Sequence, residues 1–328
     1  MIDRVVKMKT KILSALKSKN DYVSGEELSS QLGITRSAVW KNINLLKKEG
    51  YMIDSVRNRG YKLEKCPDII DAEAVRAKLN VKNIGQKIVV MKTVDSTNDE
   101  VKRRALQGEP DGLIVISDEQ TAGKGRFGRV WKSDKGSGLY FSLLMRPELP
   151  PSDISAITLA AGFAVCLAVR EYTGCDAKIK WPNDVIIGSK KICGILTEMA
   201  AQSDRLDYVV IGIGINVNHT EFPEEIKYKA SSLKLESGRE IDRNDFFVEV
   251  IRQLDIVLSS FLVSISLDDM DKFKSICATL GRNVSVERSG KIIEGIAVDI
   301  NTAGELLIRS EGKEIKVNSG EVTVQGIY

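Results

Sequence analysis

The sequence is poor in the residues that metal and nucleophilic chemistry most often use. The only histidine among 328 residues is His219, which argues against a zinc site and a histidine-based triad. The five cysteines are scattered without a Cys-x-x-Cys pair, so we expect reduced thiols. No apolar run reaches the roughly 18 residues of a membrane helix, and residues 1–10 contain no apolar signal core. These absences predict a cytoplasmic protein with no membrane partner.

Positive charge is concentrated at the N-terminal end. Residues 1–65 hold 14 Lys and Arg against 7 Asp and Glu, a net charge of +7, which leaves −4 for the rest of the +3 chain. A small basic segment on a mildly acidic chain predicts a module that binds a polyanion. A solvated helical surface is the alternative.

Residues 5–63 have the pattern of a winged helix-turn-helix. Apolar spacing predicts helices over 5–18, 25–32 and 36–49, with Ser24 and Thr35 as N-caps and Gly33 in the turn. Two short strands around a basic turn would follow as the wing. We predict DNA binding by the helix-turn-helix from Gly25 to Asn44, through Arg36, Ser37 and Lys41, and by the wing residues Arg57 and Arg59. Trp40 is interpreted as a core or packing residue. The alternatives to DNA binding are that residues 5–63 form a helical protein-interaction module or a simple cap on the next domain.

Beyond residue 67 the patterns predict an α+β protein. Gly188 and Ser189 join two strands as a hairpin, which indicates a mixed or antiparallel sheet. After Gly281, five short alternating strands predict a small barrel of about 45–50 residues. We therefore expect domains at 1–66, 67–278 and 279–328. The central domain should contain strands near 86–92, 112–117, 139–146, 176–181, 184–187, 192–199 and 207–215, and helices near 71–79, 97–107, 153–172, 243–263 and 268–278.

Residues 120–131 (QTAGKGRFGRVW) place three glycines and three cations within seven positions. Glycine permits close approach of the backbone to a ligand, and Lys and Arg bind carboxylate or phosphate. The stretch therefore predicts an anion-binding loop, with a flexible basic surface loop as the alternative. It also matches G-x-G-x-x-G, but a polar segment and a strand at 139–145 follow instead of a helix, so we reject a dinucleotide fold.

Four other stretches bring polar or small residues to the ends of predicted elements. Ser96-Thr97-Asn98 would either bind a polar ligand group or cap the helix at 97–107, with Thr97 and Glu100 as a capping pattern. Asn183 and Asp184, in Lys180-Trp181-Pro182-Asn183-Asp184, suit Mg²⁺ on a nucleotide phosphate, or form a turn beside a core tryptophan. Lys191 can neutralise negative charge at a phosphate or carboxylate. Residues 212–216 (GIGIN) leave space for a ligand, or for close contact with a helix.

Taken in this order, the stretches resemble the bacterial bifunctional biotin–protein ligases, which are also biotin operon repressors. The shared marks are S-T-N, Q-T-A-G-x-G-R-x-G-R-x-W, K-W-P-N-D, K-x-x-G-I-L and G-x-G-I-N, with a helix-turn-helix in front and a small barrel behind. The resemblance covers essentially the whole chain. It implies a biotin/lipoate ligase-like catalytic domain and an SH3-like form for the C-terminal barrel.

The resemblance implies an ATP-dependent biotin–[acetyl-CoA-carboxylase] ligase. The biotin carboxylate would attack the α-phosphate of ATP, giving biotinyl-5′-adenylate and pyrophosphate, and a lysine of a biotin carboxyl carrier protein would then take the biotinyl group. The adenylate would also be a corepressor that favours a homodimer on operator DNA. A lipoate–protein ligase and a non-enzymatic, metabolite-sensing transcription factor remain the alternatives.

The resemblance also implies residue roles. The catalytic residues would be Lys191, Arg126 and Asp184, with Asp184 helping the acceptor lysine to lose its proton. Biotin would contact Ser96, Thr97, Asn98, Gln120, Gly123, Lys124, Gly125, Arg126, Lys191 and Gly194. ATP and the adenylate would contact Arg126, Arg129, Trp131, Asn183, Lys191 and Asn216, and Mg²⁺ would lie on the phosphates beside Asn183 and Asp184. Phe222 to Leu233 resembles a second loop that folds over adenine. Lys124 stands where the family has Arg, and it keeps the charge but loses the two-pronged donor.

Overall fold

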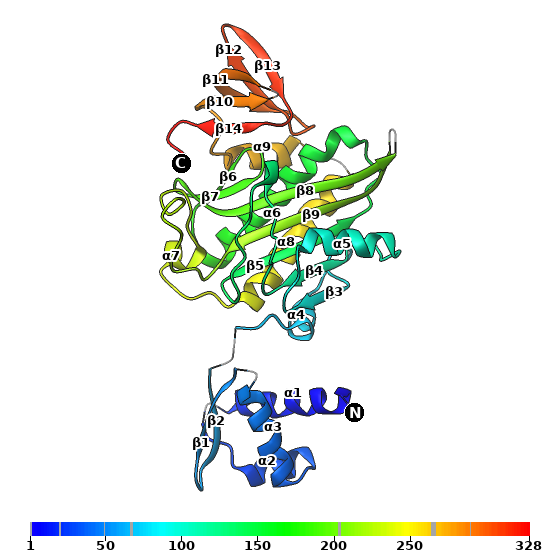
Figure 1. Ribbon diagram of the computed structural model, residues 1–328, viewed down its shortest axis with the longest axis vertical. Helices are drawn as coiled ribbons and strands as arrows, with labels where there is room; N and C mark the ends of the chain where they lie inside the picture. Colours follow the sequence, from blue (N-terminus) through cyan, green and yellow to red (C-terminus); the bar gives the residue numbers. More distant parts are fainter. Residues whose placement is uncertain are drawn as a thin grey trace. The chain divides into compact units, whose positions relative to one another are not determined.

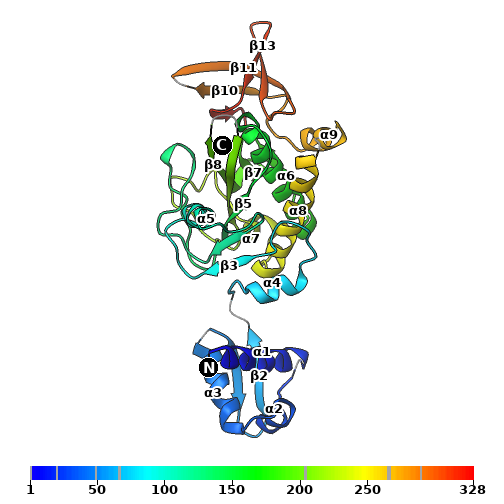
Figure 2. The same ribbon diagram turned by 90° about the vertical axis from the view of Figure 1, so that its right-hand side faces the viewer.

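Two units make up the chain, Met1–Asp68 and Ile69–Tyr328 (Figures 1 and 2). The computed structural model describes residues 2–19, 21–48, 50–65, 68–202, 205–263, 267–288 and 290–328. The predicted boundary at Cys66 and Pro67 lies outside these residues. The four described cysteines, Cys166, Cys175, Cys193 and Cys277, are free thiols.

The first unit contains the elements of a winged helix-turn-helix. Three helices, α1 (Ile2–Ser18), α2 (Gly25–Leu32) and α3 (Arg36–Lys48), precede an antiparallel hairpin of β1 (Met52–Val56) and β2 (Gly60–Lys65). The Ser24 hydroxyl accepts a hydrogen bond from the backbone N–H of Glu27 at 3.0 Å, and Thr35 from that of Ala38 at 3.2 Å. Gly33 ends α2 in the left-handed region, at φ 64°. Both predicted caps and the predicted turn are confirmed.

The buried face of α3 is narrow. Val39, Ile43 and Leu46 are at most 1% exposed and belong to the core of the first unit. Trp40 is 60% exposed, so its interpretation as a packing residue is wrong. Successive helical residues are about 100° apart, and position 40 therefore falls on the outer face beside Lys41. Arg36, Ser37, Lys41, Arg57 and Arg59 are all exposed.

The second unit is built on a seven-stranded sheet whose order is β3-β4-β5-β9-β8-β7-β6. Only β3 and β4 run parallel; the other neighbours are antiparallel, so the predicted mixed sheet and the hairpin of β7 and β8 are confirmed. The strands are β3 (Ile88–Met91), β4 (Ile114–Ser117), β5 (Gly138–Met145), β6 (Ala177–Lys180), β7 (Asp184–Ile187), β8 (Lys190–Gln202) and β9 (Arg205–Asn216).

Helices cover both faces of this sheet (Figure 2). On one side, α6 (Ile154–Thr173) and α8 (Arg243–Val263) pack against each other and against the larger core, to which Ile114 and Ile116 point. On the other side, α5 (Thr97–Leu106) covers a smaller cluster that includes Val115. This alternation along β4 places α5, and the segment before it, on the opposite face from the main core. The other helical segments are α4 (Ala72–Lys78), η1 (Arg126–Gly128), η2 (Pro151–Asp153), α7 (Leu233–Ser237), which sequence analysis missed, and α9 (Leu267–Ser275).

Among the described residues, one helical segment, Pro151–Thr173, is long and apolar enough to cross a membrane by length and composition. The expectation from the sequence that no segment meets this criterion is therefore wrong. In its most apolar window, 67% of the residues are buried inside the unit, where α6 packs on α8 and β8. The same apolar character is what a central core helix needs.

The C-terminal residues form a five-stranded antiparallel sheet of order β13-β12-β11-β10-β14. The five predicted strands are confirmed, whereas the described strand pairs include none between β13 and β14 that would close them into the predicted barrel. Trp181, at the edge of the seven-stranded sheet, donates an indole hydrogen bond to the carbonyl of Gly304 at 3.0 Å. A Cβ on Gly304 would lie 2.7 Å from the backbone nitrogen of Ala156 in α6, so only glycine fits there. These two contacts seat the C-terminal sheet on the larger one. The strands are β10 (Asn283–Arg288), β11 (Lys291–Ile300), β12 (Leu306–Ser310), β13 (Lys313–Val317) and β14 (Glu321–Val324).

Candidate active site

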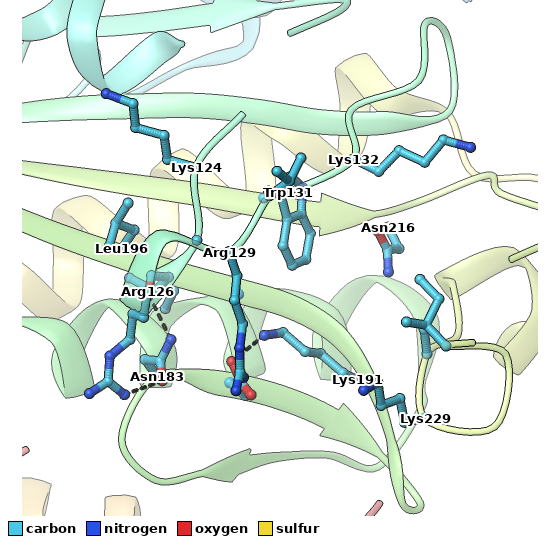
Figure 3. Close-up of a pocket in the computed structure, with 18 of the residues that line it drawn as sticks. Lys124, Arg126, Arg129, Trp131, Lys132, Asn183, Lys191, Leu196, Asn216 and Lys229 are labelled. Carbon is cyan, nitrogen blue, oxygen red and sulfur yellow. Dashed lines mark hydrogen bonds and ion pairs between the residues drawn. The ribbon is translucent and has the colours of Figure 1, made fainter. Parts of the chain in front are cut away.

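The second unit contains a cavity of about 630 Å³ (Figure 3). Its walls come from the start of α5, the loop at 120–131, strands β8 and β9, residues 221–230 and the C-terminal sheet. Most residues for which the resemblance implies a role line it together: Ser96, Thr97, Asn98, Gln120, Lys124, Gly125, Arg126, Arg129, Trp131, Asn183, Asp184, Lys191, Gly194 and Asn216. Gly123 is buried beside this cavity without lining it, with its carbonyl accepting from the backbone N–H of Trp131.

Ser96, Thr97 and Asn98 are each at most 4% exposed, at the start of α5. The Thr97 hydroxyl donates to Gln120 Oε1 at 3.1 Å, and the Asn98 amide donates to Glu198 Oε2 at 2.8 Å. Ser96 occupies the N-cap position of α5 but its side chain makes no capping hydrogen bond. The interpretation of Ser-Thr-Asn as a helix cap is therefore wrong. The three residues line the cavity instead.

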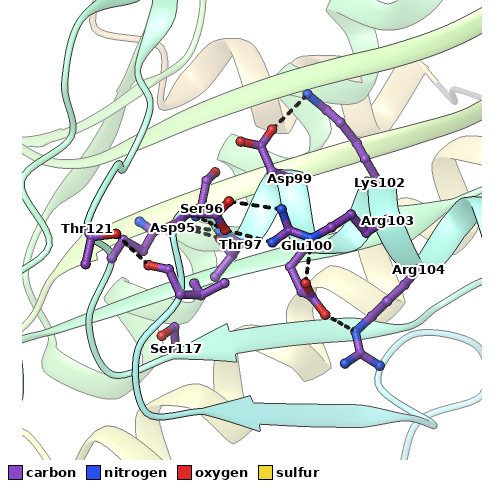
Figure 4. Close-up of polar contacts among 12 residues, drawn as sticks. Asp95, Ser96, Thr97, Asp99, Glu100, Lys102, Arg103, Arg104, Ser117 and Thr121 are labelled. Atoms are coloured by element: carbon purple, nitrogen blue, oxygen red, sulfur yellow. Dashed lines mark hydrogen bonds and ion pairs between the residues drawn. The ribbon is translucent and has the colours of Figure 1, made fainter.

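The predicted pairing of Thr97 with Glu100 as a cap is wrong for a related reason. Glu100 forms ion pairs with Arg103 and Arg104, both at 2.8 Å (Figure 4). Arg103 also makes two hydrogen bonds to Asp95, at 2.9 and 2.7 Å, and these hold the pKa of the Asp95 carboxyl at about 2. This network ties the segment before the helix to its first two turns, and so fixes the backbone that carries Ser96 to Asn98.

The glycines of β9 make room for side chains that line the cavity. A Cβ on Gly212 would lie 2.1 Å from Asn98 Oδ1, and one on Gly214 would lie 2.5 Å from the indole ring of Trp131. Both glycines line the cavity, in agreement with the expectation that they leave space for a ligand, and the atoms nearest to an added Cβ belong to Asn98 and Trp131. Their alternative interpretation, close contact with a helix, holds for Gly212, since Asn98 belongs to α5.

The loop at 120–131 folds back on itself. Gly125 donates its N–H to Arg129 O at 2.7 Å, and Lys124 and Val130 form a β-bridge. Its only helical part is the single turn η1, with Phe127 at φ 56°, so the rejection of a dinucleotide fold is confirmed. The indole N–H of Trp131 is buried and has no hydrogen-bond partner among the described residues. Because Trp131 lines the cavity, this N–H is a donor that a bound ligand could use.

Each cation of this loop is held by an acceptor from another element. Lys124 pairs with Asp99 of α5 at 2.6 Å, and Arg129 pairs with Glu321 of β14. Arg126 donates to Asn183 Oδ1 at 2.9 Å and to the carbonyl of Gly320 at 3.1 Å. The C-terminal sheet therefore contacts two of the three cations.

A second cluster surrounds Asp184 at the start of β7. Its Oδ1 pairs with Lys191 Nζ at 2.6 Å, and its Oδ2 accepts from the Tyr328 hydroxyl at 2.6 Å. Lys180, the last residue of β6, is 5% exposed and lines the same cavity. Burial lowers its pKa to about 8. No role for Lys180, Glu321 or Tyr328 follows from the sequence patterns. The only signal for any of them is the basic residue that opens K-W-P-N-D, which is Lys180.

The oxygen atoms proposed for Mg²⁺ already have cationic or hydroxyl partners. Asn183 Oδ1 accepts from Arg126, and Asp184 is held by Lys191 and Tyr328. Among the described residues, no group of three or more His, Cys, Asp or Glu could hold a metal ion. Asn183 and Asp184 therefore do not fit the role of direct magnesium ligands, because each lies beside a positive charge.

Residues 222–233, the predicted second loop, reach the cavity through Phe222, Pro223, Ile226, Tyr228, Lys229 and Ala230. The loop is tied to β8, since Lys191 donates its N–H to Lys229 O at 2.8 Å and Ser231 donates to Lys191 O at 2.9 Å. The Asn216 amide donates to Ser231 O at 3.0 Å. These contacts hold Lys191 between the loop and the sheet.

Comparison with known proteins agrees with this arrangement. Three family models match in order: an HTH domain over residues 9–62, the biotin/lipoate A/B protein ligase family over 90–216, and the biotin protein ligase C-terminal domain over 279–324. The chain is 35% identical to a bifunctional ligase/repressor of Bacillus subtilis over 305 residues, which span 92% of this chain and 94% of that protein. The chain belongs to the bifunctional biotin protein ligase family.

Other family members support this assignment. A bifunctional ligase/repressor of Escherichia coli is 29% identical over 326 residues, 99% of each chain. The solved biotin protein ligase of Aquifex aeolicus, in complex with biotin and ATP, is 32% identical with a TM-score of 0.64 and covers 73% of this chain and 99% of its own. The family resemblance seen in the motifs is thus confirmed over nearly the whole length.

Proposed function

We propose that the chain activates biotin with ATP and transfers it to a lysine of the biotin carboxyl carrier protein of acetyl-CoA carboxylase. The observation that carries this proposal is the pairing of two clusters in one cavity. A neutral cluster of Ser96, Thr97, Asn98 and Gln120 suits the ureido ring of biotin, which needs uncharged donors and acceptors. The cations Arg126, Arg129 and Lys191, which line the same cavity, suit a carboxylate and a phosphate.

In the first step, a biotin carboxylate oxygen attacks the α-phosphorus of ATP. A new P–O bond forms, the bond to the bridging oxygen breaks, and pyrophosphate leaves. Negative charge builds on the phosphate oxygens, and Arg126 and Lys191, which line the cavity, would stabilise it. The step needs no protein nucleophile and no proton transfer. His219 lines the cavity, and burial lowers its pKa, but the step requires no acid or base from it.

In the second step, the neutral amine of the acceptor lysine attacks the acyl carbon of biotinyl-5′-adenylate. The amide C–N bond forms, the acyl–oxygen bond breaks, and AMP leaves together with the proton that the attacking amine gives up. Asp184 is the carboxylate of the cluster and would take the proton that the acceptor ammonium must lose. We propose that magnesium arrives bound to the ATP phosphates, without Asn183 or Asp184 as ligands.

The test is incubation of the full chain with biotin, Mg-ATP and a biotin-carrier domain, read as the mass of the carrier. We expect the gain of one biotinyl group, dependent on ATP. A parallel incubation with lipoate in place of biotin tests the alternative acyl group, because the matching family model covers both biotin and lipoate ligases. A carrier that gains lipoyl but not biotinyl would reject the proposal.

We further propose that the first unit binds operator DNA and represses transcription in the cytoplasm when biotinyl-5′-adenylate is bound. The exposed Arg36, Ser37 and Lys41 of α3 would enter the major groove, with Arg57 and Arg59 of the wing on the backbone. The adenylate would act as corepressor by favouring a homodimer that matches a palindromic operator. In this proposal the chain keeps the predicted division at 1–66, 67–278 and 279–328.

A gel-shift titration with a family-type operator, with and without biotin plus ATP, tests the coupling. Tighter binding in the presence of both is expected, together with a doubling of mass by light scattering. Binding that ignores both ligands would overturn the corepressor role and leave the ligase proposal intact.

A further inference from the structure

Tyr328 contacts two ionisable groups of the cavity at once. Its hydroxyl donates to Asp184 Oδ2 at 2.6 Å, and its ring centroid lies 3.5 Å from Lys180 Nζ. All three residues line the cavity. The backbone holds the tyrosine in place, because Ile327 donates its N–H to Val324 O at 3.1 Å in the turn that follows β14. The proposed function gives neither Tyr328 nor Lys180 a role.

Lys180 is a buried cation with an unusual partner. It is 5% exposed, and its ammonium makes no ion pair or hydrogen bond with any residue that the structure describes; the ring face of Tyr328 is its contact. Burial lowers its pKa to about 8, so a fraction of the amine is neutral near physiological pH. A neutral lysine amine is a nucleophile, whereas an ammonium is not. Cation–π contact favours the ammonium, and the ring of Tyr328 therefore opposes the effect of burial.

Asp184 is held on both oxygens, by Lys191 on one side and Tyr328 on the other. Burial, and then the neighbouring carboxylate, raise the pKa of the Tyr328 hydroxyl, so it stays protonated and remains a donor. The hydroxyl fixes the direction of Oδ2, which is the oxygen not paired with Lys191. A carboxylate oxygen can accept a second hydrogen bond, so an acceptor lysine can approach Oδ2 while the phenol still donates to it.

We propose that Tyr328 is a positioning residue that decides which amine receives the biotinyl group. Its hydroxyl presents Asp184 to the acceptor lysine, and its ring masks Lys180. This inference rests on the proposed ligase function. If the mask is removed, the Lys180 amine attacks the acyl carbon of the adenylate, an amide bond forms, the acyl–oxygen bond breaks, AMP leaves and the amine proton passes to solvent.

Two variants of the full chain separate the two roles. Tyr328→Phe keeps the ring over Lys180 and removes only the hydroxyl, while Tyr328→Leu keeps an apolar side chain and removes both. Tyr208→Phe is the matched control, since Tyr208 packs in the cluster beneath α5 and does not line the cavity. Three quantities are measured: biotin-dependent ATP–pyrophosphate exchange, the rate of transfer to the carrier domain, and the mass of the Lys180 peptide of the enzyme.

For Tyr328→Phe we expect transfer to slow about ten- to a hundredfold, the effect of one hydrogen bond to a charged group, with exchange changed by less than about twofold. The Lys180 peptide should stay unmodified. For Tyr328→Leu we expect the same slow transfer, and in addition a biotinyl group on Lys180, which the double variant Tyr328→Leu, Lys180→Met should lack.

Wild-type transfer rates in Tyr328→Phe, or an equal fall in exchange and transfer, would overturn the positioning role. An unmodified Lys180 in Tyr328→Leu would overturn the masking role. Wild-type enzyme that fails to support biotin-dependent exchange would instead count against the proposed function, so the two failures are distinguishable.

Discussion

Replacing Gly212 by alanine tests whether this glycine of β9 exists to seat Asn98. The added methyl would lie 2.1 Å from Oδ1, 2.8 Å from Cγ and 2.9 Å from Nδ2 of the asparagine. Contacts this short cannot persist, so the Asn98 amide must leave its position. The amide now donates to Glu198 Oε2 at 2.8 Å and to Leu196 O at 3.3 Å, and accepts from the Ser142 hydroxyl at 2.6 Å.

The cost follows from these three hydrogen bonds. Each contributes about 0.5–1.5 kcal/mol net, so displacing the amide should lower the free energy of unfolding by about 1.5–4.5 kcal/mol. The affinity for biotin should fall as well, since Asn98 belongs to the proposed biotin cluster. Asn98→Ala removes the obstacle, and in that background we expect Gly212→Ala to cost less than about 0.5 kcal/mol.

Urea unfolding of the two single variants and the double variant measures this coupling, and calorimetry measures biotin binding. Gly162→Ala in α6 is the control, because a Cβ there would meet only Ile195 Cδ1, at an ordinary 3.5 Å. Additive costs in the double variant, or a Gly212→Ala protein as stable as the Gly162→Ala control, would refute the reasoning.

Three further substitutions have expected outcomes. Lys191→Ala should cut ATP–pyrophosphate exchange by orders of magnitude, whereas Lys190→Ala, outside the cavity, should stay near normal; equal rates would remove Lys191 from the catalytic set. Lys180→Met should raise stability by about 3 kcal/mol at pH 7, because the folded pKa of about 8 lies about 2.5 below the ordinary 10.5 and one pKa unit corresponds to about 1.4 kcal/mol. That gain should be full below pH 8 and vanish as the pH approaches 10.5, which thermal unfolding across pH checks. Trp40→Ala should change stability by less than about 0.5 kcal/mol, since its side chain is exposed; a larger loss in denaturant unfolding would restore the packing interpretation.

Local signals in the sequence predicted local structure well. The caps at Ser24 and Thr35 and the turn at Gly33 depend on neighbouring residues, and the structure confirms them. The helical spacing at 36–49 also puts Val39, Ile43 and Leu46 on one face, and these three residues are buried. A large aromatic side chain is usually buried, but position 40 lies on the outer face of α3, and its position on the helix determines its exposure.

The cavity was predictable where a motif carries its own polar groups, as in Ser96 to Asn98 and Lys191. It was not predictable where the partner comes from elsewhere in the chain. Arg126 meets Gly320, and Asp184 meets Tyr328, over separations of 194 and 144 residues. Pairing of Asp184 with Lys191 also turned a plausible magnesium ligand into half of an ion pair. No pattern of neighbouring residues reports such contacts.

The contacts of residues 320–328 with the cavity have a consequence for biosynthesis. The ribosome makes the loop cations Arg126 and Arg129 nearly two hundred residues before the groups that hold them, Gly320 and Glu321. A nascent or prematurely terminated chain therefore carries Arg126 and Arg129 without these partners, and Lys180 without the ring of Tyr328. The wall of the cavity is therefore complete only after residues 320–328 have been synthesised.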